Sequence, residues 1–553
     1  MPPLRHLAAA PPLRRLAALP AAALLLPLHL PAAATAQEEH ADWRRGAVCY
    51  EIFVRSFQDS DGDGVGDLRG LIERLDYIND GDPGSRRDLG ARCIWLMPVA
   101  QSPSYHGYDV TDYYRIDRDY GTNDDFKLLV FEAHKRGIRV LVDLVLNHAS
   151  SDHPYFKHAL LNPDSPYREW FLFRPRPPAG ESPWGTPIWH RSEARDEVYY
   201  GLFWGGMPDL NYESPAVVEE AKEIATFWLE ELGADGFRLD AVKHLVEENG
   251  MVQHAPATHD VLRDFAAHLR EVDPDAFTIG EVWDSIGAML PYYPDQLDAY
   301  FAFEASDAIL DAVRSGSADR LLPPFLRLQR ELPAERWSPF LRNHDQTRTM
   351  TLLEGDAAKA KLAATLLLTL PGLPFVYYGE EIGMTGDKPD PRIRTPMAWA
   401  RRPGVGFTDG LAWEPLHADS LTANVEAQDD DPGSLLHLYR TLIHLRGEQP
   451  ALAAGELVPL AASADAVAAY LRRDAAGSVL VVANLGAAPL SGVRLASDGA
   501  VLPPGRYALR GLLGEPAAAA LEVGEDGRLG GYLPLPSLGA LHAHVFALVE
   551  EDG

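Results

Sequence analysis

The stretch Val140-Leu-Val-Asp-Leu-Val-Leu146, followed by Asn147-His148, decides the fold class of this chain. It is a nearly continuous aliphatic run, whereas a strand with one wet face alternates apolar and polar side chains. Such a run predicts a strand that is buried on both faces of a parallel sheet. Similar runs recur along the chain. The eight predicted strands are Val48–Phe53, Cys93–Pro98, Val140–Leu146, Gly236–Asp240, Thr278–Glu281, Ala299–Phe303, Pro339–Asn343 and Phe375–Tyr378.

Amphipathic segments separate these runs. Asp124–Arg136, Ser214–Leu232 and His259–Val272 are predicted helices, and Ser214-Pro215 supplies a capping residue and a proline at the first helical position. Strands joined by helical crossovers predict an α/β fold, the (β/α)8 TIM barrel. In such a barrel the reactive groups lie at the carboxyl ends of the strands.

Two regions depart from this pattern. Residues 148–208 are rich in Pro, Trp, Tyr and charge and are too long for a simple connection, so we expect a small inserted domain B after strand 3. After Gly447 the chain has short strand-like runs, such as Ala466–Leu471, Ser478–Ala483 and Leu541–Leu548, between turn residues. They predict a C-terminal antiparallel β-sandwich over 448–553. The catalytic barrel then comprises 37–147 and 209–447.

The first 36 residues differ in composition from the rest. Arg5, Arg14 and Arg15 form a basic front, Leu16–Leu30 is rich in Leu and Ala, and Ala34-Thr35-Ala36 has the small residues of a cleavage site. This pattern predicts a signal peptide cut after Ala36. We therefore expect a protein that is secreted or periplasmic after cleavage.

The net charge indicates which partners to expect, and the surroundings of the two cysteines indicate their state. The net charge of −30 at pH 7 repels nucleic acids and anionic membranes, so we expect neither as a partner of the mature chain. We expect a monomer. Cys49 and Cys93 each lie in an apolar run, which favours buried free thiols, while export would allow a disulfide.

Polar clusters follow four of the predicted strands directly. They are Asp143-Leu-Val-Leu-Asn147-His148, Arg238-Leu-Asp240-Ala-Val-Lys243-His244, Gly280-Glu281-Val-Trp283 and Arg342-Asn343-His344-Asp345-Gln346. A single carboxylate in such a place could be a helix cap or part of a core ion pair. Four strand ends of one barrel, however, meet at one mouth. We therefore expect the clusters to form one site.

The residue types suit cleavage of a glycosidic bond. Retaining cleavage needs an ionised nucleophile and a carboxylic acid. Arg238 lies two residues before Asp240 and on the same strand face, so its charge should lower the pKa of Asp240. Glu281 has apolar neighbours that should raise its pKa. A third carboxylate, Asp345, could favour a positively charged transition state.

The four clusters resemble the four conserved regions of the α-amylase family, glycoside hydrolase family thirteen, and Met207-Pro-Asp-Leu-Asn211 resembles a fifth region. The resemblance extends from about Trp43 to the C-terminus. It implies that Asp240 is the nucleophile, Glu281 the general acid/base and Asp345 the transition-state stabiliser. The implied substrate-binding residues are His106, Tyr108, His148, Arg238, Lys243, His244 and His344, with Tyr108 stacked under the −1 sugar and Lys243 and His244 facing the leaving group.

A metal loop precedes these clusters. Asp59-Ser-Asp61-Gly-Asp63-Gly-Val65-Gly-Asp67 spaces oxygen ligands as a hard cation needs, and its four carboxylates would repel one another without one. Gly70 stands where an EF-hand needs Glu. The loop resembles the calcium loop of the oligo-1,6-glucosidase branch. That resemblance implies a structural Ca²⁺ bound by Asp59, Asp61, Asp63, Asp67 and the Val65 carbonyl.

The motifs that bear on substrate specificity resemble more than one branch of the family. Met207–Asn211 and the metal loop resemble the group intermediate between oligo-1,6-glucosidases and neopullulanases, whereas Lys243-His244 resembles true α-amylases. Exo-acting glucosidases of the family carry Asp three residues before the stacking Tyr. Here that residue is Tyr105, which implies an open cleft. We predict endo-hydrolysis of α-1,4-glucosidic bonds in starch and maltooligosaccharides.

Alternatives remain on the same scaffold. The chain could be a neopullulanase/cyclomaltodextrinase-like or oligo-1,6-glucosidase-like hydrolase, or a transglycosylase that converts sucrose or trehalose. A non-catalytic, membrane-anchored sugar-binding relative would lack the acids, and this chain keeps all three. The products formed from maltose and sucrose would separate hydrolysis from transfer.

Overall fold

The computed structural model describes residues 43–514 and 519–551. The predicted signal peptide and the assumed cleavage site lie outside the described residues. The core of the described chain is a parallel sheet of eight strands in the order β12-β11-β10-β9-β5-β2-β1-β13. These strands are β1 Cys49–Ile52, β2 Cys93–Leu96, β5 Arg139–Leu144, β9 Gly236–Leu239, β10 Phe277–Gly280, β11 Ala299–Phe301, β12 Trp337–Ser338 and β13 Phe375–Tyr377.

One predicted strand is displaced. Pro339–Asn343 was expected as the seventh strand, but β12 is Trp337–Ser338. Proline lacks the N–H that a ladder position must donate, so the regular ladder ends before Pro339. Its carbonyl still accepts a hydrogen bond from the Phe375 N–H at 3.0 Å, and Phe340 pairs with Phe375 in parallel. These contacts close the sheet into a barrel.

The barrel interior is filled by side chains that point inward from the strands, among them Trp95, Phe277 and Phe301. Cys49 and Cys93 belong to this layer, and the parallel register places them opposite each other on β1 and β2. They form a disulfide with a Cα–Cα distance of 4.4 Å. The expectation that favoured free thiols is therefore wrong, because register between neighbouring strands brings the two together.

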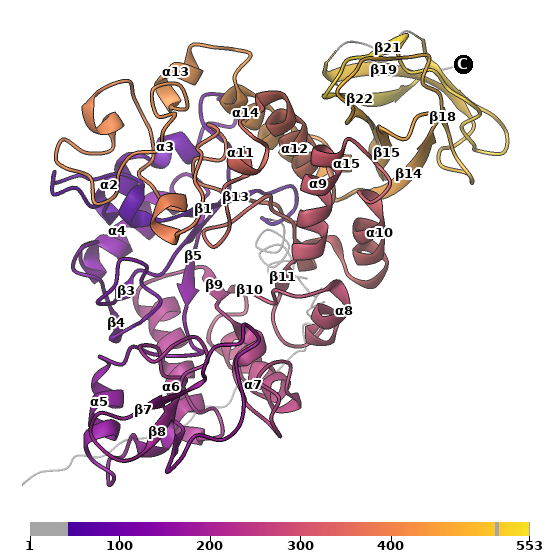
Figure 1. The fold of residues 1–553 in the computed structure, drawn as a ribbon. Helices are drawn as coiled ribbons and strands as arrows, with labels where there is room; N and C mark the ends of the chain where they lie inside the picture. Colours follow the sequence, from indigo (N-terminus) through magenta and orange to yellow (C-terminus); the bar gives the residue numbers. More distant parts are fainter. Residues whose placement is uncertain (1–42, 515–518, 552–553) are drawn as a thin grey trace, which may run out of the picture. The chain divides into compact units, whose positions relative to one another are not determined.

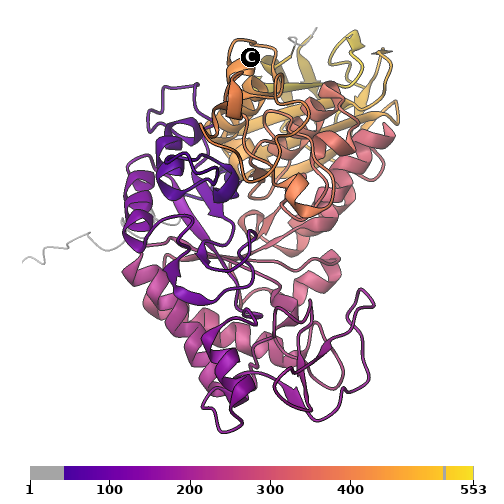
Figure 2. The same cartoon turned by 60° about the vertical axis from the view of Figure 1, so that its left-hand side comes forward.

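Helices cover the outside of the strands in both views (Figure 1) (Figure 2). The helices of the described chain outside the inserted segment are α2 Leu68–Glu73, α3 Leu75–Ile78, α4 Asn123–His134, α6 Pro215–Thr226, α7 Pro256–Val272, α8 Ile286–Met289, α9 Phe303–Ser315, α10 Leu322–Glu331, α11 Thr349–Leu352, α12 Ala357–Thr369, α13 Val425–Asp429, α14 Leu435–Glu448 and α15 Pro450–Ala454. Within the described residues, no helix combines the length and apolar character needed to cross a bilayer.

The three predicted helices form close to their expected bounds. Thr122 caps α4 through a capping box with Asp125, which fixes its start. Pro215 opens α6, and a π-helical turn, Phe227–Glu231, continues that helix. The predicted helices therefore differ from the observed ones mainly at their ends, where caps and turns decide the boundary.

Between β5 and α6 the chain forms a separate small unit. It contains α5 Pro154–Leu161 and a three-stranded sheet in the order β6-β8-β7, made of β6 Phe173–Arg174, β7 Trp189–Arg191 and β8 Val198–Tyr200. A bridge between His148 and Asp209 ties the two ends of this segment together. We call residues 148–208 the inserted segment. A hairpin of β3 Ala100–Gln101 and β4 Asp112–Ile116 carries the loop that contains Tyr108.

The C-terminal region is an antiparallel sheet of seven strands in the order β18-β14-β15-β16-β22-β19-β20, with a small second sheet of β17 and β21. The strands are β14 Glu456–Ala462, β15 Val467–Asp474, β16 Gly477–Asn484, β17 Leu490–Ser491, β18 Leu495–Ala496, β19 Gly505–Leu513, β20 Leu521–Val523, β21 Ser537–Leu538 and β22 His542–Glu550. The central strands β15 and β16 are buried on both faces. Leu471 packs in a core of this region, while Tyr470 packs in the barrel core and its hydroxyl lies 2.6 Å from Thr369 Oγ1 of α12.

Candidate active site

The strand ends bring the four polar clusters to one cavity of about 360 Å³. Asp240 follows β9, Glu281 follows β10, and Asp345 lies in the segment after β12. The side chains that line the cavity are His148, Trp184, Phe203, Met207, Asp240, Ala241, Lys243, His244, Glu281, Trp283 and Asp345. All three acids singled out in the sequence therefore face one space.

Arg238 organises the acids. Its side chain is 1% exposed, and Nη1 donates to both oxygens of Asp143, at 2.8 and 3.0 Å, and to Asp240 Oδ1 at 2.7 Å. Nη2 lies 2.8 Å from Glu281 Oε2. Burial would lower the pKa of Arg238, but the carboxylates around it hold that pKa well above its usual value. One permanent cation thus holds Asp240 and Glu281 beside each other.

The surroundings of Glu281 favour its protonated form. Burial raises its pKa to about 7, opposed by Arg238 and reinforced by the charges of Asp240 and Asp345. Its Oε2 also accepts a hydrogen bond from the Ala241 N–H at 3.2 Å. Ala241 has a φ of 48°, an unusual value for a residue with a side chain. The backbone after Asp240 is thus bent so that its N–H meets Glu281.

Asp345 has the opposite electrostatic setting. Arg394 Nη2 donates to Asp345 Oδ1 at 2.8 Å, and His344 Nε2 lies 3.3 Å from Oδ2. Burial alone would raise the pKa of Asp345, but His344 and Arg394 outweigh it and lower that pKa to about 2. Asp345 is therefore an anion across the neutral range and can stabilise positive charge that develops on a substrate.

Tyr108 and two histidines form the floor beside these acids. The Tyr108 hydroxyl donates to Asp143 Oδ2 at 2.9 Å, and its ring stacks on His344 with centroids 5.5 Å apart. His148 Nε2 lies 3.1 Å from the Tyr108 carbonyl, and burial lowers the pKa of His148. The Tyr108 N–H donates to His106 Nδ1 at 3.1 Å. His106 and His148 thus fix the Tyr108 loop.

Aromatic rings border the other end of the cavity. Lys243 Nζ donates to the Trp283 carbonyl at 2.8 Å, and the Trp283 ring stacks on Phe303 with centroids 4.9 Å apart. The Trp184 ring lies 6.0 Å from that of His244. Because Lys243 and His244 are consecutive, Trp283 and Trp184 flank the same short stretch of chain. Phe203 supports Trp184, with ring centroids 5.4 Å apart.

Sequence reasoning missed several of these residues. Glu51 contacts His344, and its only cue was an acid inside the apolar run of the first strand. Arg394 comes from the segment after β13, and no motif marked it. Trp184 and Phe203 lie in the inserted segment, where the sequence shows many aromatic residues but not which of them reach the cavity.

The predicted metal loop converges only in part. Oxygens of Asp59, Asp61 and Asp67 lie within 4.8 Å of one another. Asp63 instead accepts a hydrogen bond from the Val65 N–H at 2.8 Å. Asp67 also caps α2 through the Gly70 N–H. Three converging carboxylates provide the hard oxygen ligands that Ca²⁺ prefers, so the residues fit such an ion.

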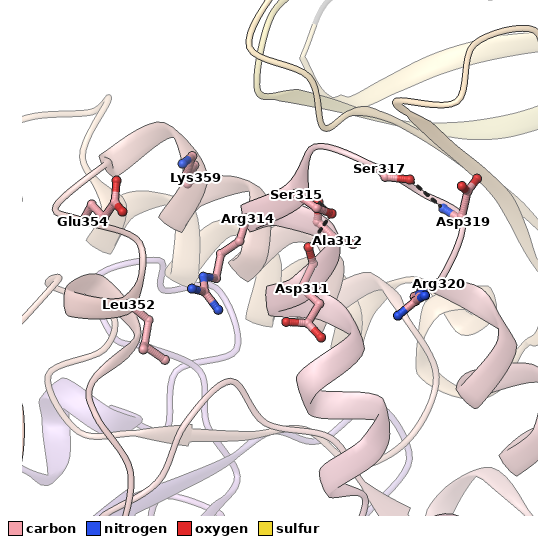
Figure 3. Close-up of a pocket in the computed structure, with 10 residues that line it drawn as sticks. All are labelled: Asp311, Ala312, Arg314, Ser315, Ser317, Asp319, Arg320, Leu352, Glu354 and Lys359. Atoms are coloured by element: carbon pink, nitrogen blue, oxygen red, sulfur yellow. Dashed lines mark hydrogen bonds between the residues drawn. The ribbon is translucent and has the colours of Figure 1, made fainter.

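A second hollow, of about 570 Å³, lies where α9 ends (Figure 3). Its lining carries charges of both signs and no aromatic ring: Asp311, Ala312, Arg314, Ser315, Ser317, Asp319, Arg320, Leu352, Glu354 and Lys359. It contains no member of the four clusters. The cavity at the barrel mouth is therefore the candidate active site.

Comparison with known proteins identifies relatives that match most of this chain. A model of the α-amylase catalytic domain matches residues 51–455. The chain is 39% identical to alpha-amylase 3 of Dictyoglomus thermophilum over 80% of this chain and 85% of that protein. It is 34% identical to the trehalose synthase/amylase TreS of Mycobacterium tuberculosis over 83% of this chain and 84% of the relative.

A solved structure of similar fold was also found. The crystal structure of the α-amylase from H. orenii superposes with a TM-score of 0.78 at 38% identity, covering 91% of this chain and all of the other. The family-model match spans most of the barrel and includes the segments that carry Asp240, Glu281 and Asp345. The chain therefore belongs to the α-amylase family of glycoside hydrolases, glycoside hydrolase family thirteen.

Proposed function

We propose that this hydrolase is a retaining endo-α-glucanase that cleaves α-1,4 bonds of starch and maltooligosaccharides. The observation that carries the proposal is the environment of Tyr105. Its ring stacks on Trp413 with centroids 5.4 Å apart and lies 5.9 Å from the Arg394 guanidinium. At position 105 an aromatic ring, and not a further carboxylate, therefore lies beside Arg394, whose carboxylate partners are Asp345 and Asp390. Such a ring can support a continuing chain of sugars.

The proposed mechanism gives each acid a separate task. Asp240 attacks the anomeric carbon while Glu281, which keeps its proton near neutral pH, protonates the leaving oxygen. Glu281 then takes a proton from the water that releases the sugar from Asp240. Asp345 and the electron-rich face of Tyr108 stabilise the positive charge that develops on the sugar ring in both steps.

The test is the size of the products over time. We expect soluble starch to lose its iodine colour before reducing sugar accumulates, with oligosaccharides of mixed length as early products. Pullulan and maltotriose should be tested beside it, because neopullulanase-like enzymes cut pullulan. Release of glucose alone from isomaltose, with starch left intact, would contradict the proposal.

A second candidate function is glucosyl transfer. The similarity to a protein named trehalose synthase/amylase supports it, and the rings of Trp184 and Trp283 could hold an acceptor sugar where water would otherwise enter. Incubation with maltose and with sucrose, followed by NMR of the products, decides this. Trehalose or a new disaccharide at the expense of glucose would favour transfer.

We also propose that the loop from Asp59 to Asp67 binds a structural Ca²⁺. Asp59, Asp61 and Asp67 supply converging oxygens, and Asp63 and the Val65 carbonyl complete the ligands expected from the sequence. Chelation should lower the melting temperature of the wild type, because an ion that binds only the folded state stabilises it. The Asp61→Asn variant should melt lower and respond less to chelator. If neither chelator nor the Asp61→Asn substitution changes the melting temperature, the proposal is wrong.

We further propose that the protein is exported and monomeric. The basic and apolar composition of residues 1–36 supports export, and the disulfide between Cys49 and Cys93 suits an oxidising compartment. Protein recovered from outside the cytoplasm should begin at Gln37. Light scattering on that material should give the mass of one chain.

A further inference from the structure

Glu51 is a buried acid that no catalytic motif contains. It lies in β1, within the barrel, and is 2% exposed. A carboxylate in such a place needs a partner, because burial of an unpaired charge is costly. Its partner is His344: Glu51 Oε1 lies 2.6 Å from His344 Nδ1 and 3.4 Å from the His344 backbone N. Of the residues in the four polar clusters, His344 is therefore the one that Glu51 contacts.

The hydrogen bonds around His344 fix its protonation. Nδ1 faces a carboxylate, which only accepts, so Nδ1 carries a hydrogen. Nε2 lies 2.6 Å from the Tyr108 hydroxyl, and that hydroxyl donates its single proton to Asp143. The tyrosine oxygen can then only accept from His344. Both ring nitrogens therefore carry hydrogens, and His344 is an imidazolium.

The ionisation of Asp143 supports this pattern. Burial raises the pKa of Asp143 to about 6, with Arg238 opposing the rise. At neutral pH Asp143 is therefore mainly a carboxylate. It accepts from Arg238 as well as from Tyr108, so it has no hydrogen to give to the tyrosine.

The groups that face His344 come from several elements: Glu51 on β1, Trp95 on β2, Tyr108 on the following loop, Asp143 on β5, Asp345 on its own segment and Arg394 after β13. Three of them are carboxylates and one is a fixed cation. Burial alone would lower the pKa of His344, but Asp345 and Glu51 outweigh it and raise that pKa. Asp345 points into the cavity, so Glu51 is the counter-ion on the protein side.

We propose that Glu51 is a positioning residue that holds His344 as an imidazolium, and that this cation fixes the hydroxyl of Tyr108 and the carboxylate of Asp345 for catalysis. The catalytic part of this inference rests on the proposed function of Asp345. Without the charge of Glu51, His344 keeps one ring proton and can no longer donate from both nitrogens. Tyr108 and Asp345 then lose a shared donor, and the stabilising anion loses a neighbouring cation.

The test is the pH dependence of Glu51→Gln, which preserves shape and removes charge. We expect kcat to fall by about 10²-fold near neutral pH, as a small misplacement of catalytic groups can cause. The deficit should grow as pH rises, because the His344 pKa falls once its counter-ion is gone. A purely structural defect would lower the rate equally at every pH.

Glu381→Gln is the matched control. Glu381 is also a fully buried glutamate, and it accepts from the hydroxyls of Tyr50 and Tyr77 without touching His344. It should leave the shape of the pH profile unchanged. If Glu51→Gln keeps the wild-type profile, or differs from it no more than Glu381→Gln does, the inference is overturned.

A measurement on the wild type keeps the inference testable if the Glu51→Gln variant folds poorly. In the wild type, ¹⁵N-histidine NMR, with His344→Gln used to assign the signal, should show both His344 ring nitrogens protonated at mildly alkaline pH. A neutral ring there overturns the inference. Asp345→Asn separates the inference from the proposed function. An active Asp345→Asn enzyme would contradict the role proposed for Asp345. An inactive Asp345→Asn enzyme together with a normal Glu51→Gln enzyme would contradict only the inference about Glu51.

Discussion

The two ends of the active cavity are built from different chemistry. At the end beneath Arg238, polar groups are buried and hydrogen-bonded, with donor–acceptor distances such as 2.7 Å to Asp240 and 2.8 Å to Asp143. At the other end, Trp184 and Trp283 are 56% and 45% exposed, and their rings contact other rings. Bond cleavage needs fixed positions and shifted pKa values, whereas binding of the departing sugar needs broad apolar surface.

The largest expected effect is at the charged end. Asp240→Asn removes the carboxylate proposed as the nucleophile while keeping its size, and we expect the rate on maltooligosaccharides to fall by about 10⁴-fold. The amide can still accept from Arg238, so the circular dichroism spectrum and melting curve should remain close to those of the wild type. Near-normal turnover by this variant would overturn the assignment of the nucleophile.

The next effect tests the proton of Glu281. Because its folded pKa is about 7, the acid form is present below that pH and is lost as pH rises through it. We therefore expect kcat/KM to decline above about pH 7. Glu281→Gln should lower the rate by about 10²- to 10⁴-fold and abolish this decline. A glycosyl fluoride, which needs no protonation to leave, should restore only the first step of the variant, so the glycosyl-enzyme should accumulate because its hydrolysis still lacks the base. An unchanged alkaline limb would exclude Glu281 as the acid.

The same contrast explains how much of the molecule could be predicted from sequence. The strands were readable because strands buried on both faces are continuous apolar runs, as in Val140–Leu146. Pro339 displaced one strand, since a missing N–H acts locally and overrides the apolar pattern. The Cys49–Cys93 bond depends on register between two strands, which neither run specifies alone.

The charged end was also easier to predict than the aromatic end. Asp240 and Glu281 directly follow strands, so barrel geometry places them at one mouth. Arg394 and Trp184 come from irregular segments whose path depends on many weak contacts, so their sequence positions did not reveal where they point. Glu51 lies on a strand, but its importance arises from a partner almost three hundred residues away.

A smaller effect is expected at the aromatic end. Trp184→Ala removes a ring that borders the cavity, and we expect KM for maltooligosaccharides to rise by about 3- to 10-fold through lost stacking. Maltosyl fluoride, which places no sugar in the leaving-group position, should be hydrolysed normally. Trp204 provides the control, because it lies in the same inserted segment and is 55% exposed but does not line the cavity. Equal effects of Trp184→Ala and Trp204→Ala would show that the ring at the cavity has no special part in binding.

The smallest effect concerns the product length. Tyr105→Asp places a carboxylate beside Arg394, where it would compete with Asp345 for the guanidinium and narrow the path of the chain. A partly exposed ion pair contributes about 1 kcal/mol, so we expect at most about a fivefold shift toward short products. Tyr105→Asn removes the ring without adding charge and separates the two causes. If both variants shift the product distribution equally, stacking on Trp413 controls the open end. If only Tyr105→Asp does so, the open end depends on the absence of a carboxylate from the Tyr105 loop beside Arg394.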